Sequence, residues 1–185
     1  WRDNWKYNGI SDLAGNVNQF CAGVRLFGSE LQIIENNDAA LLAIDMTSGS
    51  TSWKAIDATT GNLITPNGTG TTAKSVKFST GSIADYSILL SNQFGNLTNP
   101  STTAPVSQAA LNKLKALGLY PLIASASAFG GDICSISPVA NSELILHRST
   151  SAAGGLTSGV FALSINRERT AISPNHGARL AYYIP

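Results

Sequence analysis

The sequence predicts a single loop-rich domain of the α+β class, and three observations lead to that prediction. The chain has 185 residues and 43% hydrophobic content, which is enough for one domain with a substantial core. Charged residues make up only 12% of the chain, against roughly 25% in a typical soluble domain, and small neutral polar residues take their place. One segment has the periodicity of an amphipathic helix, whereas the other apolar segments are short and strand-like.

The first half of the chain contains several strand candidates. Leu31–Ile34 is an apolar run that ends at the predicted turn Asn36–Asp38, and residues 41–44 fit either a short helix or a strand. Residues 47–80 have the pattern of a β-hairpin unit, because polar and apolar side chains alternate in two places and glycine-containing turns lie between them. We place this unit within an insertion that covers residues 38–104.

The clearest helix is predicted at residues 105–117. Pro105 suits the first turn, and Gly118 is well placed to end the helix. Apolar side chains at helical spacing would form one buried face: Val106, Ala110, Leu114 and Leu117.

Three further strand candidates follow, at residues 144–146, 160–163 and 178–184. Between Arg148 and Tyr183, a regular set of glycine, apolar and arginine residues is separated by small or polar residues of no evident pattern. A catalytic site needs particular side chains at particular places, whereas this segment has the pattern of a fixed scaffold with interchangeable surface residues. We therefore expect a recognition surface rather than a reaction centre.

Composition and motifs argue against several other classes of protein. The net charge of +1 gives no electrostatic footprint for nucleic acid, and no apolar run approaches the roughly 20 residues of a membrane span. Cys21 and Cys134 fit buried small hydrophobes better than a disulfide framework, and neither they nor His147 and His176 have zinc-ligand spacing. Because the chain starts at Trp1 without an initiator methionine, we expect further residues upstream.

Both ends of the chain resemble a known family. Asp12–Val17 is similar to the DLxGNVWEW motif of C-type lectin folds of the formylglycine-generating-enzyme (sulfatase-modifying-factor) type, although Asn18–Phe20 stands in place of WEW. The segment from Arg148 to Arg179 resembles the closing RGGxW…G…R…GFR pattern, with Ala152 in place of the tryptophan. The resemblance implies one C-type lectin-like domain over residues 1–185.

The C-terminus is most similar to the variable proteins of diversity-generating retroelements and to related phage tail-tip adhesins. Laid without gaps on residues 148–181, the family pattern coincides at what we call the frame residues: Arg148, Gly155, Gly159, Val160, Phe161, Ala162, Leu163, Arg169, Gly177, Arg179 and Ala181. The family's mutable asparagines then fall on Ser151, Ala153, Gly154, Thr157, Ser164, Asn166, Arg167, Ala171, Ser173 and Asn175. Each of these residues can be reached from an asparagine codon by changing adenines alone. We add His176, whose side chain could contact a ligand. We call these ten positions and His176 the display positions.

The resemblance implies a receptor-binding protein without catalysis, whose ligand-binding segment spans residues 148–183. The implied partner is a protein or glycan receptor on a bacterial surface, with no nucleic acid and no membrane insertion. The implied location is the virion, at a phage tail tip, or the cell surface, and the implied assembly is a homotrimer or a tail-tip complex.

Alternatives from other classes stay open. One is a structural virion protein of the same fold, and another is a divergent formylglycine-generating enzyme. The enzymes of that type use paired reactive cysteines near the C-terminus, and this chain has no cysteine after Cys134. No cofactor is expected, although a structural calcium ion is an alternative to a solvated turn at Asn36–Asp38.

Overall fold

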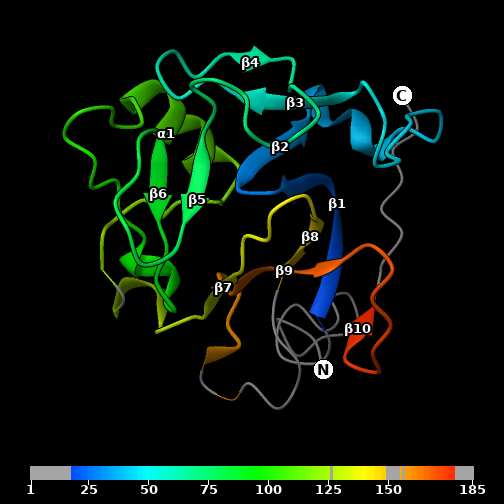
Figure 1. Ribbon diagram of the computed structural model, residues 1–185. Helices are drawn as coiled ribbons and strands as arrows, with labels where there is room; N and C mark the ends of the chain where they lie inside the picture. Colours follow the sequence, from blue (N-terminus) through cyan, green and yellow to red (C-terminus); the bar gives the residue numbers. More distant parts are fainter. Residues whose placement is uncertain (1–17, 126, 149–154, 156, 178–185) are drawn as a thin grey trace.

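The computed structural model describes residues 18–125, 127–148, 155 and 157–177. Over these ranges ten strands form one mixed sheet, and one α-helix of nine residues packs against it (Figure 1). The strands are β1 (Asn18–Phe27), β2 (Glu30–Ile34), β3 (Trp53–Ile56), β4 (Leu63–Ile64), β5 (Lys77–Ser79), β6 (Ser87–Leu89), β7 (Cys134–Ile136), β8 (Glu143–Arg148), β9 (Leu163–Glu168) and β10 (His176–Gly177). The helices are α1 (Gln108–Ala116) and the short 3₁₀ helices η1 (Glu35–Ala40), η2 (Phe94–Asn96) and η3 (Ser127–Phe129). The predicted α+β class is therefore wrong, because strands dominate the described residues and α1 is too short to form a helical layer.

Strand β1 lies near the centre of the sheet, whose order is β4-β3-β2-β1-β8-β9-β7. In addition β10 pairs in parallel with β1, while β5 pairs with β2 and, in parallel, with β6. The pairing of β1 with β8 shifts register between Phe20 and Arg25. Gly23 lies in this irregular stretch at φ +80°, and a Cβ there would overlap the Cβ of Ala39, so only glycine fits.

The core lies on one face of this sheet. Leu26 of β1 and Leu144 of β8 pair directly, and both belong to the buried cluster that also contains Ala110 and Leu114 of α1. Because successive side chains of a strand point to opposite faces, Ile145 lies on the other side of the sheet, which we call the second face. Directly paired residues share a face, so Arg25 and Gln32 also lie on the second face, as do His147 and Ser164.

The predicted helix is confirmed but begins three residues later than expected. Ser107 caps it, since its Oγ accepts a hydrogen bond from the backbone N–H of Ala110 at 3.2 Å. Val106 instead donates its backbone N–H to Oδ1 of Asn99 at 3.0 Å, which holds it in the preceding loop. Gly118 adopts φ +66° just beyond the helix, as expected of a residue that ends one.

Other local predictions have mixed outcomes. The strand at Leu31–Ile34 is confirmed as part of β2, and the hairpin unit supplies β3, β4 and β5, which extend the same sheet. Residues 41–44 form neither a helix nor a strand, because this short apolar run is exposed after η1 and Leu42 is 99% exposed. The last predicted strand, 178–184, lies outside the described residues.

Candidate functional site

The buried carboxylate of Asp132 fixes the turn that leads into β9. Its Oδ1 accepts the backbone N–H of Gly159 at 2.9 Å, and its Oδ2 accepts the N–H of Phe161 at 2.9 Å. A Cβ at Gly159 would overlap both carboxylate oxygens, so a glycine is required there. Two frame residues are therefore held through their backbones by a residue outside the C-terminal segment.

Phe161 joins an aromatic cluster on this turn. Its ring centroid lies 5.0 Å from that of Phe129, edge-on, and 6.4 Å from that of Phe94, nearly parallel. The prediction of a buried strand at Val160–Leu163 is wrong for its first part. Val160 and Phe161 are exposed residues of the turn, because the contact with Asp132 bends the chain there, and β9 starts at Leu163.

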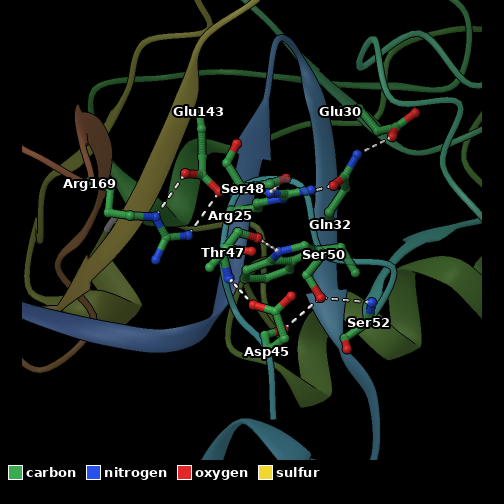
Figure 2. A network of polar contacts seen from close by, with 11 residues as sticks. Arg25, Glu30, Gln32, Asp45, Thr47, Ser48, Ser50, Ser52, Glu143 and Arg169 are labelled. Atoms are coloured by element: carbon green, nitrogen blue, oxygen red, sulfur yellow. Dashed lines mark hydrogen bonds and ion pairs between the residues drawn. The ribbon is translucent and has the colours of Figure 1, made fainter.

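Just beyond the other end of β9, Arg169 joins an ion-pair group with Glu143 and Arg25 (Figure 2). Nη1 of Arg25 donates to Oε1 of Glu143 at 2.7 Å, and Nε of Arg169 donates to Oε2 at 3.0 Å. The Arg25 side chain is 5% exposed and that of Arg169 is 43% exposed. Burial disfavours the charged form of Glu143, but hydrogen bonds from Arg169 and Arg25 outweigh it and lower the pKa of that carboxyl.

A fourth frame residue, Arg148, is anchored to the end of α1. Its Nη2 donates to the carbonyl oxygen of Gly118 at 2.6 Å, at the helix end where unpaired carbonyls favour a cation. A Cβ at Gly118 would overlap this guanidinium. Arg148, Gly159 and Arg169 thus each make a contact that the fold needs.

The described display positions differ in how much they reach solvent. Thr157, Arg167 and Asn175 are exposed, and Ser164 is buried between β8 and β7, opposite His147 and Ser135. The remaining ones are half-buried: Asn166, Ala171, Ser173 and His176. The predicted positions Ser151, Ala153 and Gly154 lie outside the described residues. Ser164 is thus poorly placed for surface contact.

The end of β9 and strand β10 bring display positions close together. Nδ2 of Asn166 donates to Oγ of Ser135 at 2.9 Å, which orients its side chain. Burial, and then the charge of Arg167, lower the pKa of His176, and Arg167 also acts electrostatically on His147. Arg167 and His176 are therefore neighbours, whereas Thr157 lies at the opposite end of β9, where its carbonyl oxygen accepts a bond from Ile133.

Two histidines stack on each other next to Arg167. The rings of His147 and His176 lie 5.0 Å apart at an interplanar angle of 16°, and Phe20 packs edge-on against both. Burial, and then the charges of His176 and Arg167, lower the pKa of His147 to about 4. His147 is 1% exposed, so its neutral ring has a packing role in the second face.

Sequence reasoning missed Asp132 and the role of Arg25. Asp132 gives no sequence signal, because its partners are backbone groups 27 and 29 residues away. Arg25 did carry a signal, since it lies on a strand whose neighbour β2 presents Glu30 and Gln32 on the same face. A charged residue on a strand that lies inside a sheet predicts a nearby partner of opposite charge.

The thiols are unpaired. Burial raises the pKa of Cys134 to about 12 and also raises that of Cys21, so both are protonated at neutral pH. Among the described residues no three His, Cys, Asp or Glu side chains gather as a metal site would require, and Asn36 and Asn37 form an exposed left-handed turn.

Over the described ranges, no helix has the length and apolar character to cross a membrane. No protein-family model matches the chain, and no curated protein is significantly similar to it.

Proposed function

We propose that this protein binds a receptor on a bacterial surface, as an adhesin at a phage tail tip, through a C-terminal surface that tolerates variation. One observation carries the proposal, namely the division of the segment into anchored and outward-facing positions. Gly159, Phe161 and Arg169 are fixed by Asp132 and Glu143. The exposed positions between and after them can change without breaking these contacts.

Recognition on this surface is non-covalent. Arg167 offers a guanidinium that can pair with carboxylates, phosphates or sugar hydroxyls, and arginine is a frequent energetic anchor at interfaces. Asn175 presents an exposed amide while its carbonyl oxygen accepts the N–H of Asn18 at 2.8 Å. The backbone of the loop is thereby tied to β1 while its side chains stay available, which separates stability from specificity.

An enzymatic role in thiol oxidation fits the same residues less well. That chemistry needs a thiolate, and the raised pKa of Cys134 makes its thiolate scarce at neutral pH. Binding needs no such group, so the anchored surface alone suffices for the proposed function.

The test is cell binding. Fluorescently labelled protein is mixed with a panel of bacteria of differing surface chemistry, and bound fluorescence is read by flow cytometry. We expect at least one strain to bind, and the double variant Arg167→Ala/Asn175→Ala to lose about tenfold in affinity. The matched control is Lys74→Asn, because Lys74 is exposed and its φ of 58° suits asparagine.

Two outcomes would overturn the proposal. One is a folded protein that binds no strain and no glycan on an array, which would favour a structural virion role. The other is a double variant that binds every strain as the wild type does. The size of the protein by sedimentation then tests the expected homotrimer separately.

A further inference from the structure

The second face of the sheet contains a pocket that is distinct from the display positions. It has a volume of about 340 Å³, within the range of small-molecule sites. It lies where the register of β1 shifts, beside the loop that leads into β3 and near the end of β9. Its lining residues are Phe20, Cys21, Ala22, Gly23, Val24, Met46, Trp53, Ile145 and Arg169.

The walls of this pocket are apolar and held in place. Trp53 donates its Nε1–H to the carbonyl oxygen of Thr47 at 3.0 Å, and the guanidinium of Arg25 lies 4.3 Å from its ring centroid. Asp45 accepts the N–H of Thr47 at 2.8 Å, which fixes the loop that carries Met46 (Figure 2). The pocket is therefore pre-formed, and flat rings are the shape that its aromatic side chains pack against best.

The charged side chain in the lining of this pocket is a guanidinium. Among the residues that the structure describes, Arg169 is the one charged side chain in the lining, and no acidic side chain contributes to it. Arg169 shares the carboxylate of Glu143 with Arg25, so Glu143 is not a counter-charge for Arg169 alone. With 43% of its side chain exposed, Arg169 can approach an anion at the pocket edge.

We propose that this pocket binds a small aromatic carboxylate, with its ring against Trp53, Met46 and Ile145 and its carboxylate toward Arg169. This site is separate from receptor binding, and it stands whether or not the display surface binds bacteria. Its chemistry follows from the apolar walls and from the guanidinium of Arg169 at the pocket edge.

The chain offers a precise reporter for this test, because Met46 is its only methionine. Protein labelled with ¹³C at the methionine methyl group is titrated with 2-naphthoate, and the signal assigned to Met46 is followed by NMR. We expect a saturable ring-current shift. The uncharged 2-naphthalenemethanol and the cationic 2-naphthylmethylamine should bind more weakly, in that order. An absent shift, or equal affinity for all three probes, would overturn the proposal.

A variant tests the role of the guanidinium. Arg169→Gln should weaken 2-naphthoate about fivefold, which is the upper end for a half-exposed ion pair, and should leave 2-naphthalenemethanol unchanged. Lys74→Asn, which removes the same charge at an exposed distant position, should leave both unchanged. Equal weakening by the two variants would overturn the assignment of Arg169. If Arg169→Gln does not fold, the order in which the three probes bind the wild-type protein still tests the proposal.

Discussion

The backbone N–H of Gly159 lies 2.9 Å from Oδ1 of the buried Asp132, and the missing side chain of the glycine makes room for that carboxylate. Asp132 precedes Gly159 by 27 residues and also binds Phe161. One acidic side chain thus sets the path of the chain into β9, on which Asn166 and Arg167 lie. This relationship, together with the others described above, leads to specific expectations.

Gly159→Ala should destabilise the protein by about 2 kcal/mol, because the added methyl group must displace the Asp132 carboxylate from its two amides. The free energy of unfolding from urea titration measures this. Gly49→Ala is the matched control, since a Cβ at Gly49 meets no atom within 4 Å and its φ is not left-handed. Similar losses in the two variants would contradict the proposed clamp.

Removing the shared carboxylate should cost more than removing one of its partners. Glu143→Gln leaves the buried guanidinium of Arg25 without its counter-charge, and we expect a loss of about 3 kcal/mol. Arg169→Gln removes only a half-exposed partner, so we expect a loss below about 1 kcal/mol. Urea unfolding of both variants gives the comparison, and a larger loss for Arg169→Gln would refute this ranking.

His147 should make the protein less stable in mild acid. Its pKa is about 4 in the folded protein, against 6.5 ordinarily, so between these values the unfolded chain binds a proton that the folded chain does not. Stability is therefore full above pH 6.5, falls as the pH drops toward 4, and loses at most about 3 kcal/mol to this group. Below pH 4.5 the lowered pKa of Glu143 adds a second loss in the same direction.

The variant His147→Phe isolates the contribution of the histidine. It keeps a ring between Phe20 and His176 and removes the proton site, so its stability should change less between pH 6.5 and 4 than that of the wild type. Thermal unfolding followed across this range measures the difference. Parallel pH profiles for the two proteins would show that His147 is not the group responsible.

The display positions should tolerate substitution according to their exposure. In a library displayed on yeast and sorted for folded protein, Arg167 and Asn175 should accept nearly every residue, because surface changes usually alter stability by less than about 0.5 kcal/mol. Ser164 should accept only small residues, since a large one would be buried opposite His147. Free variation at Ser164 would contradict its interior position.

The sequence predicted those elements whose signals are local. The helix could be placed because Ala110 and Leu114 recur at helical spacing and glycine follows at position 118. Strand β2 could be placed because Leu31, Ile33 and Ile34 form a short, mainly apolar segment before a turn, and all residues of the strand are buried. The class was wrong because short strands such as β6 and β7, of three residues each, carry too little pattern to be recognised and counted.

For the candidate site, the sequence indicated which residues matter but not which residues they contact. The resemblance of the C-terminus to a family pattern marked Gly159 and Arg169 as frame residues, but their partners Asp132 and Glu143 become neighbours only when the sheet forms. Spacing could not distinguish buried from exposed display positions either. Ser164 is buried because β7 and β8 flank this part of β9, which depends on strand order.

The pairing of β1 with β8 also constrains how the chain reaches its native state. Arg25 and Glu143 are 118 positions apart, yet they meet at the centre of the sheet. A ribosome must therefore release nearly all of the intervening chain before the central strand finds its neighbour, and until then β1 keeps an unsatisfied edge. Such long loop closures slow folding, so this protein should mature in milliseconds to seconds rather than microseconds, and its newly made chains should be most prone to associate during that interval.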